Sequence, residues 1–257
     1  MILKQLIQII EDKFPPALAY KWDNVGLLAG HPNRSIQTVL VTVDVNSSVA
    51  QEAAETGADL ILSHHPIFMN GIKNARVDTE QGKMLQTLLC NDISVYAAHT
   101  NLDIAPTGIN AQLATLFGLK DVQILADEQP GGIGLGRIGK LKHAVSLEEF
   151  AQICKTKLNT PAVRISGNPQ KRIQNVAIGS GSCSEYISVA IEKGADVMLT
   201  ADMKYHPAID AVLEGIAVVD AGHYPTEMIA MDIFTTLLQD YGLKIFRSSY
   251  GDIFRYY

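Results

Sequence analysis

Residues 38–66 read TVLVTVDVNSSVAQEAAETGADLILSHHP, and this stretch decides the fold class. The β-branched run at 38–43 predicts a buried strand, and residues 47–56 predict a helix whose N-cap is one of its first two serines. A glycine ends that helix, and residues 59–63 predict a second buried strand. A strand, a helix, a glycine and a strand in this order are typical of a parallel α/β unit.

Similar elements flank this unit. Apolar residues recur at helical spacing from Ile2 to Ile10, and Pro15 and Pro16 end the predicted N-terminal helix. Downstream, residues 79–90 predict a helix and residues 93–98 predict a further strand. We therefore expect a sheet of parallel strands covered by helices.

A second copy of the pattern follows later in the chain. IQNVAI at 173–178 matches IQTVLV at 36–41, and GADVMLT at 194–200 matches GADLILS at 57–63. Both matches have the same offset, because 173 − 36 and 194 − 57 both equal 137. A match without gaps is less expected of two unrelated βαβ units, so we interpret it as an internal duplication.

The duplication predicts two similarly organised α/β halves, residues 1–125 and 126–257. Their join is expected near residues 120–140, where the run DEQPGG at 127–132 is rich in turn formers. The last segment is free to pack back on the first half.

The composition describes a folded chain and excludes several classes of protein. Of 257 residues, 47% are hydrophobic and 19% are charged, which excludes disorder as the main state. A net charge of −6 argues against a broad nucleic-acid-binding surface. The three cysteines show no CxxC spacing, and no apolar run approaches the roughly 18 residues of a membrane span. We expect a cytoplasmic protein with no membrane contact.

The strongest chemical motif is Ser63-His64-His65-Pro66, at the end of a predicted strand. Neighbouring residues inside a strand point to opposite faces, so two such histidines cannot easily bind one metal there. Where the strand turns into a loop, each could reach one of two nearby metals. The alternative is a pair of solvated loop histidines.

Two further motifs have the form histidine, three residues, carboxylate. His99 and Asp103 follow the strand at 93–98, and His223 and Glu227 follow its counterpart IAVVDA at 216–221. Imidazoles and carboxylates without a nearby cysteine suit Zn²⁺, Mn²⁺, Fe or Ni²⁺. The alternative for Glu227 is support of a helix start through the helix dipole.

The second half places other polar residues where the first has its histidine pair. At offset 137, Ala201 and Asp202 align with His64 and His65. Asp202 and His206 are candidates for proton transfer, and Lys204 for neutralising a phosphate. A polar loop with local hydrogen bonds is the alternative.

The run GLGRIG at 134–139 matches the dinucleotide-binding pattern GxGxxG. No strand precedes it and no helix begins at its end, so we interpret its glycines as part of a β-hairpin. The next helix is expected at Ser146, where Ser146 and Glu149 form a capping box.

Near the N-terminus, Trp22 lies in a predicted tight turn. The functional alternative is that Trp22 lines the mouth of a pocket.

Together these residues resemble the Nif-three-like, or YbgI-like, family of dinuclear-metal proteins, also named GTP cyclohydrolase 1 type 2. The resemblance covers nearly the whole chain. It rests on five motifs: WDNVGL at 22–27, SHHP at 63–66, AHTNLD at 98–103, TADMKYH at 200–206 and GHYPTE at 222–227.

The resemblance implies two α/β domains with a pair of divalent metal ions in the cleft between them. By position, the implied ligands are His64, His65, Asp103, His223 and Glu227. His99 matches a position close to the metals and is expected to support them or to transfer protons.

The resemblance also implies that the chain assembles as a toroidal homohexamer.

The favoured function is a metal-dependent hydrolase acting on a small molecule, in particular a nucleotide. In the GTP cyclohydrolase reaction, water attacks C8 of guanine and formate leaves after ring opening. A phosphoesterase could use the same metal pair. The competing class is non-catalytic: a metal-binding regulatory protein or metal chaperone.

Overall fold

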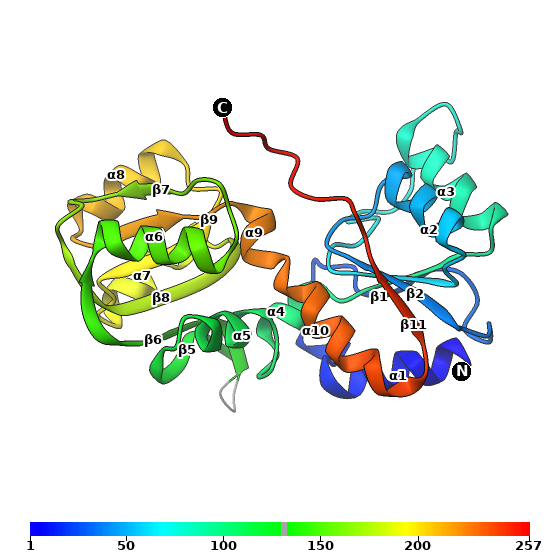
Figure 1. The fold of residues 1–257 in the computed structure, drawn as a ribbon, viewed down its shortest axis with the longest axis horizontal. Helices are drawn as coiled ribbons and strands as arrows, with labels where there is room; N and C mark the ends of the chain where they lie inside the picture. Colours follow the sequence, from blue (N-terminus) through cyan, green and yellow to red (C-terminus); the bar gives the residue numbers. More distant parts are fainter. Residues whose placement is uncertain (130–132) are drawn as a thin grey trace. The chain divides into compact units, whose positions relative to one another are not determined.

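The computed structural model describes residues 1–129 and 133–257, which form two compact units (Figure 1). Unit 1 contains Met1–Ala105 and Ala230–Gly251, and unit 2 contains Pro106–Ile229 and Asp252–Tyr257. The chain therefore enters each unit twice. Both units are α/β, as the sequence predicts.

Unit 1 is built on a five-stranded sheet with the strand order β1-β4-β3-β2-β11. All neighbours pair in parallel except β1, which lies antiparallel to β4 at one edge. The strands are β1 (Gly26–Ala29), β2 (Thr38–Thr42), β3 (Leu60–Ser63), β4 (Ser94–Ala97) and β11 (Lys244–Arg247). The carboxyl ends of the parallel strands meet at one edge, where α/β proteins place ligands.

Helices cover both faces of this sheet, with α2 and α3 on one side and α1 and α10 on the other (Figure 1). Leu40, Ile61 and Val95 of the sheet are buried with apolar residues of α2 and α3. The helices of unit 1 are α1 (Leu3–Lys13), η1 (Pro16–Leu18), α2 (Ser47–Thr56), α3 (Glu80–Cys90), α4 (Thr100–Ile104), α10 (Ile229–Leu238) and η3 (Gln239–Tyr241).

The N-cap of α2 differs from the one expected. Asn46 has an extended backbone, and its side chain accepts a hydrogen bond from the Val49 N–H, so Asn46 caps the helix. Ser47 is the first helical residue and donates its hydroxyl to Glu80 instead. An asparagine caps a helix as well as a serine does, and Asn46 directly precedes the two expected serines.

Unit 2 is built on a six-stranded sheet with the order β5-β6-β8-β9-β10-β7. Its strands are β5 (Lys120–Gln129), β6 (Ile133–Ser146), β7 (Arg164–Ser166), β8 (Arg172–Ser182), β9 (Val197–Ala201) and β10 (Ala217–Asp220). Its helices are α5 (Ile109–Leu116), α6 (Leu147–Lys157), η2 (Ser184–Tyr186), α7 (Ile187–Glu192), α8 (Tyr205–Leu213) and α9 (His223–Glu227). Strands β8, β9 and β10 are parallel, and β7 is antiparallel at the edge.

The two sheets repeat one topology, which supports the predicted duplication. The order β1-β4-β3-β2 in unit 1 corresponds to β7-β10-β9-β8 in unit 2, with an antiparallel edge strand in both. In both units a helix, α1 or α6, precedes that edge strand in the chain.

The duplication extends to single hydrogen bonds. The carboxylate of Asp59 accepts hydrogen bonds from the backbone N–H groups of Gln37 and Thr38, at 2.8 and 3.0 Å. The carboxylate of Asp196 accepts the same two bonds, 137 positions later, from Gln174 and Asn175 at 2.9 and 2.7 Å. Asp59 thereby connects the start of β3 to the start of β2, and Asp196 connects the start of β9 to the start of β8.

The glycines of the GxGxxG pattern lie in β6, which pairs antiparallel with β5. Strand β5 does precede the pattern, contrary to the expectation, but no helix begins at its end, and the antiparallel pairing with β5 confirms the hairpin interpretation. Ser146 caps α6 in a capping box with Glu149, also as predicted. The predicted turn at 127–132 falls partly on residues 130–132, outside the described residues.

The compact units are cut at other places than the halves 1–125 and 126–257. Strand β5 pairs with β6 and therefore lies in unit 2, whereas β11 pairs with β2 and lies in unit 1. The halves stay a prediction about the duplication. Within residues 1–129 and 133–257, none of the helices has the length and hydropathy needed to cross a membrane.

Asp59→Asn should lower the free energy of unfolding of unit 1 by about 1–2 kcal/mol, because the two backbone bonds to Oδ2 lose their charge assistance and the ion pair of Oδ1 with Arg34 is lost. Backbone hydrogen bonds and Arg34 outweigh burial and lower the pKa of Asp59 from 3.8. The carboxylate therefore stabilises the fold above pH 3.8, and the difference from wild type should shrink only below that pH.

Urea unfolding followed by circular dichroism and by the emission of Trp22, the single tryptophan, measures this effect. Asp210→Asn is the matched control, because Asp210 is exposed on α8. Equal destabilisation by both substitutions would contradict the assigned role of Asp59.

Candidate metal centre

In unit 1, the histidine pair leaves β3 at the carboxyl edge of the sheet. The backbone N–H of His64 donates to Thr42 O and that of His65 donates to Val43 O, so β2 holds both residues as the strand ends. His64 is fully buried and His65 is partly exposed. Beyond β4, His99 precedes α4, and Asp103 lies inside this short helix.

These side chains converge. The ring centroids of His64, His65 and His99 lie 4.9 to 5.3 Å apart. One nitrogen from each ring lies within 4.8 Å of the others, a spacing that could hold a metal ion. Asp103 is buried, and its Oδ1 lies 3.9 Å from His64 Nε2. The structure thus brings together the four residues that the sequence nominated in this half.

Oxygen atoms hold the Nδ1 atom of each of these rings. The partners are Ala98 O for His64 at 2.9 Å, Asp44 Oδ1 for His65 at 2.8 Å, and Asp23 Oδ1 for His99 at 2.8 Å. A carbonyl or carboxylate oxygen can only accept, so Nδ1 carries the hydrogen in the neutral ring and Nε2 carries the lone pair. Metal-binding histidines are oriented in this way.

Asp23 ties His99 to the start of α4. It accepts hydrogen bonds from His99 Nδ1 and from the backbone and hydroxyl of Thr100. Burial alone would raise the pKa of Asp23, but these hydrogen bonds outweigh it and lower the pKa to about 2. Asp23 is therefore a fixed negative charge behind His99.

In unit 2, His223 and Glu227 lie one turn apart on α9, with 3.1 Å between His223 Nε2 and Glu227 Oε2. His223 Nδ1 faces Asp202 Oδ2 at 2.6 Å. Burial would lower the pKa of His223, but the two carboxylates outweigh it and raise the pKa to about 9. Without a metal, His223 is a cation between two anions. The same two carboxylates, Asp202 and Glu227, would also attract a divalent cation.

Asp202 holds an uncommon backbone conformation, with φ at +53° directly after β9. Aspartate tolerates the left-handed region better than most residues. This turn presents its carboxylate to His223, so Asp202 orients a predicted metal ligand. The proton-transfer role that the sequence suggests for Asp202 stays a prediction.

Gly181 makes room for Glu227. A Cβ at position 181 would lie 2.2 Å from Glu227 Oε1 and 3.3 Å from the His223 ring. The backbone of Gly181 is left-handed, with φ at +61°. Its N–H donates to the Thr226 hydroxyl, which fastens α9 to the end of β8. A side chain is excluded here both by the backbone and by the carboxylate.

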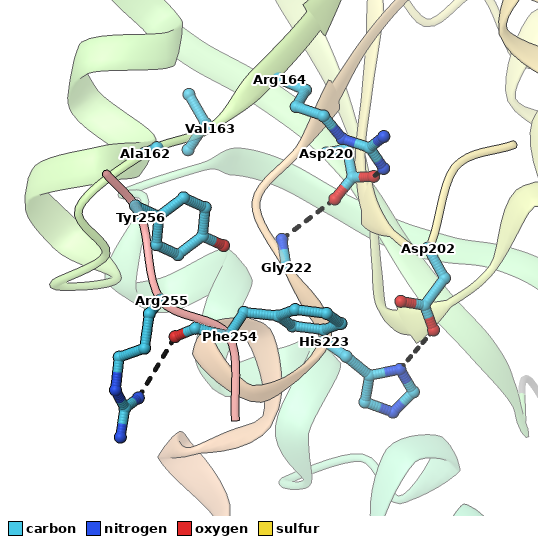
Figure 2. A pocket seen from close by; sticks show the side chains of 10 residues that line it. All are labelled: Ala162, Val163, Arg164, Asp202, Asp220, Gly222, His223, Phe254, Arg255 and Tyr256. Carbon is cyan, nitrogen blue, oxygen red and sulfur yellow. Dashed lines mark hydrogen bonds and ion pairs between the residues drawn. The ribbon is translucent and has the colours of Figure 1, made fainter. Parts of the chain in front are cut away.

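A cavity of about 330 Å³ adjoins His223 in unit 2. Figure 2 shows the Asp202 carboxylate facing the His223 ring, with Phe254 and Tyr256 of the C-terminal segment nearby. Arg164 forms an ion pair with Asp220 in the same wall. The cavity could admit a small molecule to His223.

Two predicted residues are not brought to this group. His206 is exposed on α8, and its ring contact is with Tyr205. Lys204 is exposed at the N-cap of the same helix. Their suggested roles stay predictions.

Sequence reasoning missed Asp23, Asp44 and Gly181. Asp44 could have been found, because it follows a predicted strand at the carboxyl edge where ligands gather. Asp23 lies in the motif WDNVGL, but its partner His99 is 76 positions away. Gly181 aligns with Asp44 at offset 137, but the alignment of the two halves does not indicate that Gly181 leaves room for Glu227.

Comparison with known proteins decides the family. The model of the family described as Duf34/NIF3 (NGG1p interacting factor 3) matches residues 1–251. The chain belongs to the Duf34/NIF3 family. This confirms the family resemblance.

NIF3-family relatives of similar length match most of the chain. A protein of Clostridium perfringens, named GTP cyclohydrolase 1 type 2 homolog, is 34% identical, with 88% of this chain and 87% of the relative covered. A protein of the same name from Clostridium acetobutylicum is 33% identical, with coverages of 92% and 89%.

Solved structures of the NIF3 family share the fold. The Staphylococcus aureus hypothetical protein SA1388 has a TM-score of 0.93 and 29% identity, with 100% of this chain and 99% of that chain covered. Reduced HcgD from Methanocaldococcus jannaschii has a TM-score of 0.85 and 34% identity, with coverages of 97% and 98%.

Gly181→Ala should lower the affinity for metal about tenfold or more, because the new Cβ displaces Glu227 without removing any ligand. Elemental analysis and competition with a chelator dye measure it. Gly194→Ala is the matched control: Gly194 is also left-handed, at φ +74°, but a Cβ there meets nothing within 4 Å. Equal metal retention in both variants would contradict a role for Glu227 in metal binding.

Proposed function

We propose that this chain binds two divalent metal ions and uses them as a hydrolase of the GTP cyclohydrolase 1 type 2 kind. The proposed ligands are His64, His65, Asp103, His223 and Glu227. The observation that carries the proposal is that all four histidines, these three and His99, have Nδ1 held by an oxygen acceptor. Such bonds orient Nε2 for a metal, whereas solvated loop histidines need none of them.

The donors fit the proposed ions. Neutral imidazoles and carboxylates without a thiolate suit Zn²⁺, Mn²⁺, Fe²⁺ or Ni²⁺. Asp103 and Glu227 are both buried, and a buried carboxylate needs a nearby positive charge or hydrogen-bond donors. Two carboxylates and three imidazoles leave coordination positions for water or substrate.

A bound metal pair would supply an acidified water and would polarise the electrophilic atom of the substrate. The chain itself supplies a means of moving a proton. Asp23 fixes the tautomer of His99 so that its Nε2 can accept a proton, and the ionised carboxylate stabilises the imidazolium that results. Asp202 holds His223 in the same way but at a proposed ligand.

The substrate is proposed from the relatives' name, GTP cyclohydrolase 1 type 2 homolog. In that reaction water adds to C8 of guanine and opens the ring to a formamide, and a second water then releases formate. The proton-transfer pair of Asp23 and His99 favours an enzyme over a metal carrier, because a carrier needs no general base.

The toroidal homohexamer is proposed on the family resemblance alone, and analytical ultracentrifugation would test it.

Protein purified without chelators should contain about two metal equivalents per chain and should convert GTP to a fluorescent pterin precursor and formate. Metal analysis and a coupled formate assay measure this with Zn²⁺, Mn²⁺, Fe²⁺ and Ni²⁺ in turn. Metal binding without turnover of GTP or of a phosphoester panel would favour the non-catalytic alternative. Phosphoester cleavage alone would make it a phosphoesterase.

Substitutions should separate ligands from the proton-transfer group. His64→Ala should lose both metal and turnover. His99→Gln should keep the metal and lower kcat by about 10²- to 10⁴-fold, because general acid–base catalysis is lost. His143→Gln, at an exposed position of β6, should change neither. His206→Gln tests the predicted role of His206 in the same assay, and a normal kcat would remove it.

A further inference from the structure

Trp22 is an exposed aromatic residue beside the histidine group of unit 1. It is the single tryptophan of the chain, and 60% of its surface is exposed. Its indole ring meets the edge of His99 at a centroid distance of 6.1 Å. Large aromatic rings usually leave water on folding, so an exposed ring next to a proton-transfer group is a candidate for substrate contact.

The ring is held in place although it is exposed. It stacks on Tyr20 with centroids 5.6 Å apart and ring planes 19° from parallel. The backbone on both sides is fixed, because the Tyr20 N–H donates to Thr100 Oγ1 and Asp23 binds His99 and Thr100. A ring already fixed by its neighbours loses little conformational entropy when a ligand packs on it.

A cavity lies next to the turn that carries Trp22. Asp23 and Asn24, the two residues that follow Trp22, line a cavity of about 330 Å³ together with residues 68–72. The Asn24 amide donates to Phe68 O at 2.6 Å and fastens that segment to the Trp22 turn. A purine ring fits within such a volume, which lies at the lower end for ligand sites.

The charges around Trp22 favour a neutral ring over a phosphate. Asp23 is ionised and stands directly behind His99, and Asp44 faces His65. The phosphates of a nucleotide would be repelled by these carboxylates wherever a cation does not intervene. The face of a heterocycle carries no charge and gains from stacking on an indole.

We propose that Trp22 is the stacking platform for the planar heterocycle of the substrate and places it beside His99. The inference rests on the proposed function, because that function makes a nucleotide base the reacting group. It names a contact that the metal ligands do not provide. Tyr20 is a positioning residue that supports the indole from its other side.

A fluorescence titration tests the platform directly, since Trp22 is the only indole. Guanosine, which has the ring but no phosphate, should quench the emission saturably when indole alone is excited. Ribose 5-phosphate, which has a phosphate but no ring, should not. Equal responses to both compounds, or no response to guanosine, would overturn the proposal.

Calorimetric titration with guanosine compares variants that lack the indole signal. Trp22→Leu should weaken binding about 5- to 100-fold, and Trp22→Phe should weaken it less because a flat ring remains. Tyr241→Leu is the matched control, since Tyr241 is an exposed aromatic residue of unit 1 that precedes the start of β11. Thermal unfolding verifies that each variant is folded. Unchanged affinity in folded Trp22→Leu would overturn the platform.

Two outcomes separate this inference from the proposed function. Turnover of GTP with no response of Trp22 would overturn the platform and leave the hydrolase in place. Quenching by guanosine without any turnover would support the platform and remove the proposed reaction. Emission that changes with protein concentration alone would place the ring in a contact between copies of the chain and overturn the proposal.

Discussion

The hydrogen bonds accepted by Asp59 and Asp196 hold the sheet frameworks on which the histidine groups of unit 1 and unit 2 depend. Each carboxylate binds two consecutive backbone N–H groups across the start of a β-α-β unit. This fixes two parallel strands in register at one end. Their other ends, where His64 and Asp202 follow β3 and β9, are then placed by the ladder itself, since a slip of one residue would reverse every side chain. The positions of the candidate site residues at one edge of each sheet therefore depend on hydrogen bonds at the opposite edge.

One framework carries two different chemistries. Where the first copy has Asp44 to hold His65, the second has Gly181, and the room it leaves is taken by Glu227. Glutamate is one methylene longer than Asp103, its counterpart, so it needs that room. The acceptor for the second-half histidine comes instead from Asp202, at the position of His65 in the first copy. In unit 2, the end of β9, the counterpart of β3, therefore supplies the orienting carboxylate, and the predicted ligands His223 and Glu227 follow β10, the counterpart of β4.

The sequence predicted the elements and the clustering of the histidines of unit 1 well, because both depend on local pattern. Hydrophobic runs, the repeat at offset 137 and the His-x3-carboxylate spacing all lie within short windows. The supporting residues escaped because their partners are distant: Asp44 meets His65 21 positions away, and Asp23 meets His99 76 positions away. His206 shows the converse limit. It shares a motif with Asp202, but an intervening helix start leaves it exposed.

The pairing of β11 with β2 has a consequence for synthesis on the ribosome. Residues 106–229 form one uninterrupted stretch of unit 2, whereas the sheet of unit 1 lacks its last strand until residue 247 has been made. Until then, β2 is an apolar edge strand with unpaired backbone N–H and C=O groups, and such an edge can pair with another chain. The sheet of unit 1 is therefore completed only after most of unit 2 has been synthesised, and a chaperone that shields β2 would protect the chain during that interval.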